Sequence, residues 1–143
     1  MSEALYRKDL LRLAADAAGA GRLASPHASV TVHNPACGDR ITVDLALENG
    51  RIAAIAHSTQ ACVLTQASAA ILGADATGLN RAEIAALTDS VRGMLKGGAA
   101  PMAPFDVYKV FEGVADHAGR HKCVLLPLEA ALKALESLET AKP

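Results

Sequence analysis

The feature that most constrains the fold is a pair of extended segments joined by an Asn-Gly dipeptide. Residues 40–48 alternate between apolar and polar side chains, and residues 51–59 are again typical of an extended chain. Asn49 and Gly50 lie between the two segments, and both residue types accept the positive φ angles of a two-residue hairpin turn. Residues 29–33 add a third, β-branched segment. One face of the first segment carries Ile41, Val43, Leu45 and Leu47, and the other carries Thr42, Asp44 and Glu48.

Helical patterns precede this sheet and dominate the chain after it. The expected helices are residues 3–17, 62–72 with a stop at Gly73, 81–96, and 123–138, with one or two helical turns over 107–114. Asn80 and Glu83 form a capping-box pattern before the third helix. Pro127 is tolerable only near the first turn of the last helix. The sequence predicts an α+β fold, in which a small three-stranded antiparallel sheet is packed on one face by helices, in a single domain over residues 1–143.

Charge and hydropathy exclude several classes of protein. The net charge is −1, so there is no electrostatic basis for binding nucleic acid or an anionic membrane. No run of about 18 apolar residues is present, and the first 21 residues carry charges throughout, unlike a signal peptide. We therefore expect a cytoplasmic protein.

The chain has three cysteines, an odd number that argues against a disulfide framework. Each lies at a junction between predicted elements. Cys37 follows the first strand, Cys62 joins the last strand to a helix, and Cys123 precedes or opens the last helix. A helix N-terminus favours a thiolate, which is both a nucleophile and a metal ligand. The competing interpretation is three separate, half-buried thiols.

The segment Cys37-Gly38-Asp39 is more specific than the cysteine count. The glycine permits a tight turn, so the thiol and the carboxylate can face the same point. Such a set is suited to zinc or to an iron–sulfur cluster, although Asp39 can instead simply stabilise the turn. The paired C-x-x-C units of a zinc ribbon are absent, which excludes that kind of structural zinc site.

Three motifs together resemble the U-type iron–sulfur scaffold proteins (IscU, SufU and the N-terminal domain of NifU). They are the run Asn34-Pro35-Ala36-Cys37-Gly38-Asp39, then Cys62 with Ala67-Ser68-Ala69, and finally Lys122-Cys123 before an apolar helix. The long separation of Cys62 from Cys123, and Lys122 where IscU proteins have histidine, resemble the SufU branch. Gln60-Ala61 departs from the family, in which glycine usually precedes the second cysteine.

The resemblance implies a set of four ligands: Cys37, Asp39, Cys62 and Cys123. It implies a pyridoxal-phosphate cysteine desulfurase as the sulfur donor, Cys123 as the persulfide acceptor, and apo-proteins or downstream assembly factors as recipients. Two mechanisms stay open: a scaffold for a [2Fe–2S] cluster, or a zinc-dependent sulfurtransferase. A third alternative is a purely structural zinc protein of the same fold. His121 is a candidate substitute ligand, and Lys122 either assists ionisation of Cys123 or is simply solvated.

Overall fold

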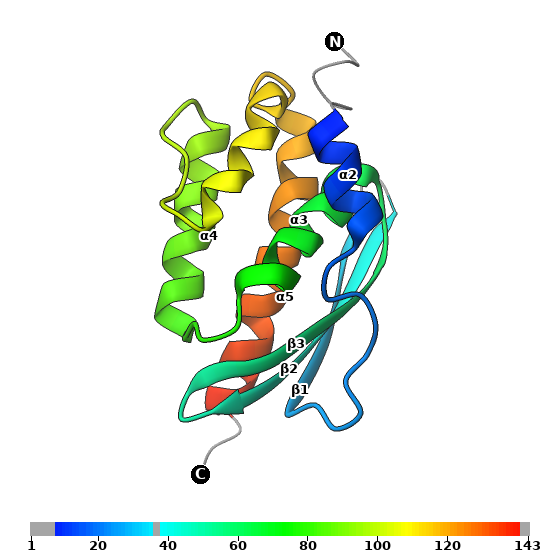
Figure 1. The fold of residues 1–143 in the computed structure, drawn as a ribbon, viewed down its shortest axis with the longest axis vertical. Coiled ribbons are helices and arrows are strands. Elements are labelled where there is room, and N and C mark those ends of the chain that lie inside the picture. Colours follow the sequence, from blue (N-terminus) through cyan, green and yellow to red (C-terminus); the bar gives the residue numbers. More distant parts are fainter. Residues whose placement is uncertain (1–7, 36–37, 141–143) are drawn as a thin grey trace.

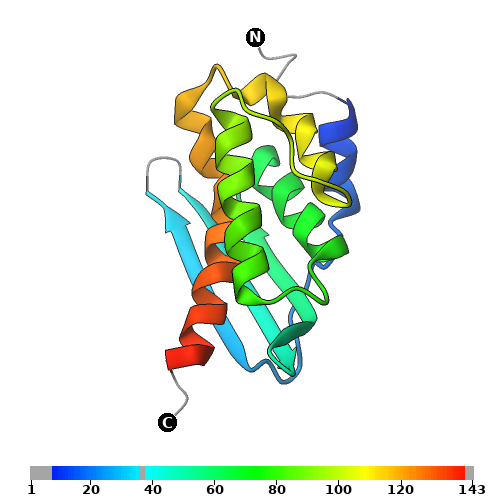
Figure 2. The same ribbon diagram turned by 90° about the vertical axis from the view of Figure 1, so that its left-hand side faces the viewer.

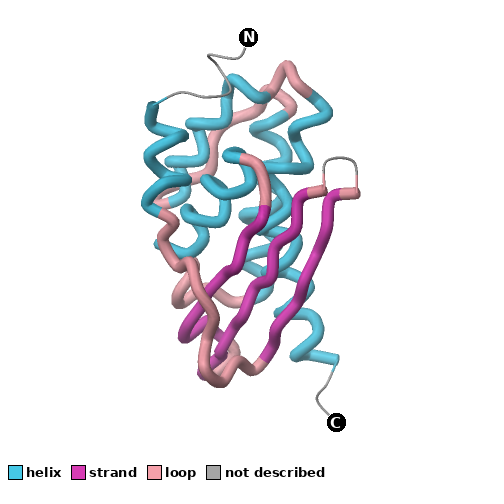
Figure 3. The backbone as a smooth tube through the Cα atoms, turned by 90° about the vertical axis from the view of Figure 1, so that its right-hand side faces the viewer, coloured by secondary structure: helices cyan, strands magenta, loops and turns pink. Residues whose placement is uncertain are grey.

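A computed structural model describes residues 8–35 and 38–140, and within them one antiparallel sheet carries helices on one face (Figure 1). The strands are β1 (Ala28–Asn34), β2 (Asp39–Glu48) and β3 (Arg51–Gln60), paired in the order β1-β2-β3. Figure 3 shows the three strands side by side with helices beyond them. The predicted α+β class and the three-stranded antiparallel sheet are confirmed.

The hairpin between β2 and β3 forms at the predicted dipeptide. Glu48 pairs with Arg51, and Asn49 and Gly50 form the turn with φ angles of 56° and 80°. Both angles are positive, as a two-residue turn matched to the twist of the strands requires. A register shift between Ala46 and Leu47 marks an irregularity near this end of the sheet.

The opposite end of the sheet contains Asp39 and leads into the helix that follows Gln60. Asn34 at the end of β1 pairs with Asp39 at the start of β2, and Arg40 pairs with Gln60 at the end of β3. The chain enters its next helix directly after Gln60. Asp39 and the start of that helix therefore lie at the same end of the sheet.

The described helices follow the predicted order, with differences at their ends. They are α2 (Lys8–Asp16), α3 (Val63–Asp75), α4 (Arg81–Leu95), the 3₁₀ helices η1 (Phe105–Val114) and η2 (Ala118–Arg120), and α5 (His121–Thr140). α5 lies against β1 and β2, α3 lies against β3, and α4 packs on the outer side of α5 (Figures 1 and 2). The first predicted helix, residues 3–17, is described only from Lys8 onward.

The core forms where the alternating strand meets these helices. Ile41, Val43 and Leu45 are each at most 1% exposed, and Leu128 of α5 is fully buried. The apolar face predicted for residues 41–47 is therefore the face that the helices cover. Burial of such side chains contributes about 1.5–3 kcal/mol each.

Two expectations about the helices have clear outcomes. The capping box at α4 is confirmed, because the Glu83 N–H donates to Asn80 Oδ1 (2.8 Å) and the Asn80 N–H donates to Glu83 Oε1 (3.0 Å). The predicted stop at Gly73 is wrong, because α3 continues to Asp75. A Cβ on Gly73 would lie 2.1 Å from the Ala18 carbonyl oxygen. The glycine therefore permits close packing of the segment after α2 rather than ending the helix.

The polar face of β2 includes a buried carboxylate. Asp44 is fully buried, and its carboxylate accepts hydrogen bonds from Arg22 Nε (2.7 Å), Ser29 Oγ (2.6 Å) and the Leu23 N–H (3.0 Å). Burial alone would raise the pKa of Asp44, but these hydrogen bonds outweigh it and hold the pKa below its usual value. The segment after α2 thereby closes over the outer face of the sheet.

Candidate metal centre

Asp39 is held at the start of β2 with its carboxylate directed at the start of α3. The side chain is only 4% exposed. Its Oδ1 accepts the Cys62 backbone N–H at 3.1 Å, and its Oδ2 lies 3.0 Å from the Thr65 hydroxyl oxygen. A helix N-terminus has unsatisfied N–H groups and a partial positive charge, so it stabilises a carboxylate here. The carboxylate thus reaches out of its own turn and joins β2 to α3.

Cys62 is the N-cap residue of α3. Its backbone is extended (φ −67°, ψ 167°), as is usual for the residue immediately before a helix. The side chain is half-buried, and its Sγ lies 3.4 Å from Asp39 Oδ2. The predicted junction between the last strand and a helix is therefore where the structure has this cysteine.

Cys123 is the third residue of α5, which begins at His121. The sequence predicted that Cys123 precedes or opens the last helix. The helix instead begins two residues before it. Its thiol is almost completely buried, with 1% exposure. Pro127 consequently lies in the second turn rather than the first, so the helix has a proline inside it.

Asp39, Cys62 and Cys123 together form what we call the thiol–carboxylate cluster. One ligand atom from each lies within 4.8 Å of the others. A tetrahedral zinc ion, with bonds of about 2.3 Å to sulfur and about 2.0–2.2 Å to oxygen, holds its ligand atoms about 3.6–3.8 Å apart. The cluster therefore fits a thiophilic metal ion with side-chain movements of about 1 Å. Two thiols and one carboxylate are also a donor set that suits zinc or iron.

The thiol of Cys62 has the lower proton affinity that a ligand or nucleophile needs. A hydrogen bond from the Cys123 thiol is the largest contribution, and burial opposes it. Hydrogen bonds from the N–H and the hydroxyl of Thr65 add to the effect, whereas the negative charge of Asp39 opposes it. The balance lowers the pKa of Cys62 to about 6.

Two of the predicted site residues lie outside this cluster, and a third, Cys37, is not among the described residues. Of the residues on either side of Cys37, the Gly38 N–H donates to the Asn34 carbonyl at 2.9 Å. His121 Nε2 lies 3.1 Å from the Ala115 carbonyl oxygen and is not one of the described cluster ligands. Lys122 is exposed and lines a separate pocket beside Asn34.

Two hydroxyl residues of α3 were not recognised from the sequence as part of the site. Thr65 lies three residues after Cys62, so both occupy one face of the helix, and its hydroxyl contacts the cluster. The three-residue spacing between Cys62 and Thr65 is the sequence feature that could have identified Thr65 as part of the site. Ser68, which the sequence offers only as part of a motif, is fully buried, and its hydroxyl donates to the Val124 carbonyl of α5 at 2.6 Å.

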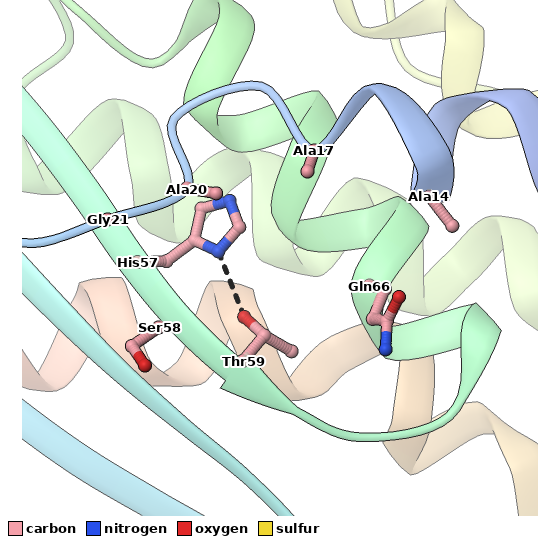
Figure 4. A pocket seen from close by; sticks show the side chains of 8 residues that line it. All are labelled: Ala14, Ala17, Ala20, Gly21, His57, Ser58, Thr59 and Gln66. Carbon is pink, nitrogen blue, oxygen red and sulfur yellow. Dashed lines mark hydrogen bonds between the residues drawn. The ribbon is translucent and has the colours of Figure 1, made fainter.

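A separate pocket of about 270 Å³, which none of the cluster residues lines, lies between β3, α3 and the end of α2 (Figure 4). His57 borders it, with Nε2 at 2.9 Å from the Ala18 carbonyl and Nδ1 at 2.9 Å from the Thr59 hydroxyl. A carbonyl can only accept, so Nε2 carries the proton and Nδ1 accepts from Thr59. Burial lowers the pKa of His57, although the bond to Ala18 opposes the shift. His57 is thus a neutral side chain that joins β3 to the segment after α2.

Over residues 8–35 and 38–140, no helix combines the length and apolar character needed to cross a membrane.

Comparison with known proteins gives both a family and a set of relatives. Residues 5–124 match the model of the NifU-like N terminal domain. The crystal structure of a nitrogen-fixing NifU-like protein (N-terminal) from Brucella abortus has a TM-score of 0.93 and 34% identity, with 99% of each chain covered.

Two further relatives are more distant. The iron–sulfur cluster assembly scaffold protein IscU of Streptococcus pyogenes serotype M1 is 27% identical over 115 residues, which are 80% of this chain and 72% of that protein. A Fervidobacterium islandicum AW-1 protein, described as a candidate iron–sulfur cluster assembly scaffold for the SUF system, has a TM-score of 0.81. It is 21% identical, with 94% of this chain and 99% of that chain covered, so it supports the fold alone.

Proposed function

Since this chain belongs to the NifU-like N terminal domain family, we propose that it takes part in iron–sulfur cluster assembly through the thiol–carboxylate cluster. The observation that carries the proposal is the convergence of Asp39, Cys62 and Cys123 within 4.8 Å from three separate chain segments. Thiolates are the ligands that zinc and iron–sulfur clusters share. The relative from Streptococcus pyogenes is named as such a scaffold, which supports the same role here.

We propose Cys37 as the fourth ligand beside these three residues. It stands two positions before Asp39 in the sequence, between Asn34 and Gly38, which a hydrogen bond joins at 2.9 Å. Three thiolates and one carboxylate suit a [2Fe–2S] cluster carried as cargo, or one zinc ion that keeps its bound thiols ionised. The carboxylate oxygen is the weakest of the four donors to these metals, so Asp39 is the proposed release point.

The proposed sulfur donor is the persulfide of a pyridoxal-phosphate cysteine desulfurase. A thiolate of this chain attacks the outer sulfur, a new S–S bond forms, and the donor cysteine leaves as a thiolate, so no external oxidant is needed. We propose Cys123 as the acceptor. Because its thiol is 1% exposed, acceptance there requires the start of α5 to open on docking, and half-buried Cys62 is the accessible competitor.

The proposal has two mechanistic forms. Lys122, and the α4–η1 segment between Cys62 and Cys123, support a SufU-like, zinc-dependent persulfide carrier with enzyme-like turnover. The 27% identity with a protein named IscU supports a [2Fe–2S] scaffold with no turnover of its own. A zinc protein of the same fold without sulfur transfer is the alternative to both.

In either form we propose that the chain acts as one domain over residues 1–143, in the cytoplasm. Its products would pass to acceptor apo-proteins or to downstream assembly factors. The net charge of −1 offers no basis for a nucleic-acid or membrane partner.

The test is anaerobic purification followed by metal and sulfide analysis, before and after incubation with a cysteine desulfurase, cysteine and ferrous iron. A visible cluster that is lost in Cys37→Ala, Cys62→Ala and Cys123→Ala identifies the scaffold. One zinc per chain, no cluster and faster desulfurase turnover identify the persulfide carrier. Zinc with neither activity overturns the proposal in favour of the structural alternative.

Asp39 has its own test in the same assay. Asp39→Ala should lengthen the lifetime of an assembled cluster, or change the affinity for zinc, because it removes the most labile donor. Asp89→Ala is the matched control, since Asp89 is 79% exposed and its ion pair with Arg92 lies within α4. Equal behaviour of the two variants would show that Asp39 serves only to join β2 to α3.

A further inference from the structure

A buried hydroxyl lies where the three described members of the thiol–carboxylate cluster meet. Thr65 is fully buried, and its Oγ1 lies 3.0 Å from Asp39 Oδ2, 2.9 Å from the Cys123 carbonyl oxygen and 3.6 Å from Cys62 Sγ. One side chain of α3 therefore contacts a residue of β2, a residue of α5 and the N-cap of its own helix. A buried polar atom in such a position is fixed by its hydrogen bonds, because leaving one unmade costs about 1–3 kcal/mol.

The bond to Cys123 has a specific origin in the sequence of α5. In a regular helix the Cys123 carbonyl would accept the N–H of residue 127. That residue is Pro127, which has no N–H, so the helix cannot supply this hydrogen bond. The Thr65 hydroxyl supplies one from outside the helix at 2.9 Å. One turn further along α3, Ser68 donates to the Val124 carbonyl. Side chains of α3 therefore donate hydrogen bonds to two successive carbonyls of α5 near the proline.

The second partner of the hydroxyl is the carboxylate. A hydroxyl has one proton, and the two nearest acceptors share it: the Cys123 carbonyl at 2.9 Å and the Asp39 carboxylate at 3.0 Å, with Cys62 Sγ more distant at 3.6 Å. Thr65 thus links the orientation of the Asp39 carboxylate to the position of the Cys123 backbone. Coordination draws electron density from a carboxylate oxygen, so we expect the proton to turn to the Cys123 carbonyl in the metal-loaded protein.

We propose that Thr65 is a positioning residue that sets the metal affinity of the cluster by holding Asp39 and Cys123 in register with Cys62. The inference rests on the proposed function, because it concerns the same cluster. Hydrogen-bond partners of metal ligands typically change metal affinity 10- to 100-fold when they are removed. Here one hydroxyl orients one ligand directly and another through its backbone.

The principal test replaces Thr65 with valine, which keeps the shape and removes the hydroxyl, and with serine, which keeps the hydroxyl. Cobalt(II) replaces zinc as a coloured probe, and affinity is read from competition with a chelator. We expect Thr65→Val to bind cobalt about 10- to 100-fold more weakly and to shift its thiolate-to-metal absorption. Thr65→Ser should stay within about threefold of the parent in affinity and keep its spectrum.

Thr88→Val is the matched control. Thr88 is also a buried threonine of a helix, with 3% exposure, and its hydroxyl donates to the Ile84 carbonyl at 2.8 Å within α4. The same change there should affect stability and leave cobalt binding unaltered. Equal affinity of Thr65→Val and the parent, or equal losses in Thr65→Val and Thr65→Ser, would overturn the proposal.

A measurement on the metal-free protein separates this inference from the proposed function. Alkylation of each cysteine is followed by mass spectrometry, and Thr65→Val should expose Cys123 to alkylation faster than Thr88→Val does. Thr65→Val combined with Pro127→Ala restores an N–H for the Cys123 carbonyl, so protection of Cys123 should return while cobalt affinity stays low through Asp39. A parent protein that binds no metal but shows this pattern would contradict the proposed function alone. Unchanged protection of Cys123 in Thr65→Val would overturn the role of Thr65.

Discussion

In the metal-free protein the Cys62 thiol should titrate near pH 6, well below its ordinary value of 9.0. At pH 7 a pKa of about 6 leaves about nine-tenths of the thiol ionised, whereas a pKa of 9.0 would leave about 1%. The largest cause is the hydrogen bond from the neighbouring Cys123 thiol. Cys123→Ala should therefore raise the pKa of Cys62, and Cys123→Ser, which retains a donor, should raise it less.

The size of the pKa shift of Cys62 determines which observable should be measured. The ionised fraction at pH 7 rises about 90-fold, but a less basic thiolate is a weaker nucleophile by about 16- to 32-fold over three pKa units. The net gain in alkylation rate at pH 7 is then only about three- to sixfold. The midpoint of the rate against pH is the sharper readout, because it moves by the full shift.

The assay is iodoacetamide alkylation of Cys62 between pH 4.5 and 10, quantified by peptide mass spectrometry on protein freed of metal. The expected midpoint lies near 6 in the parent and higher in Cys123→Ala. A midpoint near 9 in the parent, or one that Cys123→Ala leaves unchanged, would refute the assignment of the low pKa to the pair of thiols.

Further predictions concern the fold around the cluster. Asp44→Asn should cost about 1–3 kcal/mol of unfolding free energy at pH 7. The folded pKa of Asp44 is depressed, so its contribution is complete above the unfolded value of about 3.9 and is lost as the pH falls toward the folded value. Urea unfolding should therefore show the gap between the parent and Asp44→Asn narrowing by pH 3, and an equal gap at both pH values would contradict this. Gly73→Ala should destabilise by about 1–3 kcal/mol through its contact with Ala18, whereas Gly93→Ala, with open space around it in α4, should stabilise by about 0.5–1 kcal/mol. Thermal unfolding compares the two, and equal effects would refute the packing role of Gly73. The imidazole of His57 should titrate below 6.5 by NMR, so stability should rise with pH between its folded pKa and 6.5. A midpoint above 6.5 would show that the ring is not held neutral by burial.

The sheet could be predicted from the sequence because its signals are local. Asn49-Gly50 specifies a turn by its own backbone preferences, and the alternation of residues 41–47 specifies which face is buried. The capping box at Asn80 is equally local. Such features depend only on neighbours in the chain, so they can be predicted before the fold is known.

The features that could not be predicted depend on partners distant in the chain. From the sequence, Gly73 was predicted to end a helix, whereas in the structure it allows the Ala18 backbone to approach closely. The alternation places Asp44 on the polar face of its strand but gives no sign that Arg22 and the chain around it cover this residue. Tertiary contacts override local preference at both positions.

The candidate site divides in the same way. Asp39, Cys62 and Cys123 could be identified by residue type and family motif, and the structure brings their ligand atoms together. Thr65 carries no motif, and its contact with the Cys123 carbonyl follows from Pro127, which the sequence indicated only as tolerable near the first turn of the helix. The identity of the ligands could thus be predicted from the sequence, but the hydrogen bonds that orient them could not.

The central claim is that Asp39, Cys62 and Cys123 bind the metal directly, and X-ray absorption at the zinc or iron edge of the loaded protein tests it most directly. The account predicts sulfur neighbours at about 2.3 Å with one oxygen neighbour at about 2.0–2.2 Å, and one sulfur fewer in Cys62→Ala and in Cys123→Ala. A first shell of nitrogen and oxygen alone, or a sulfur count that both variants leave unchanged, would contradict it.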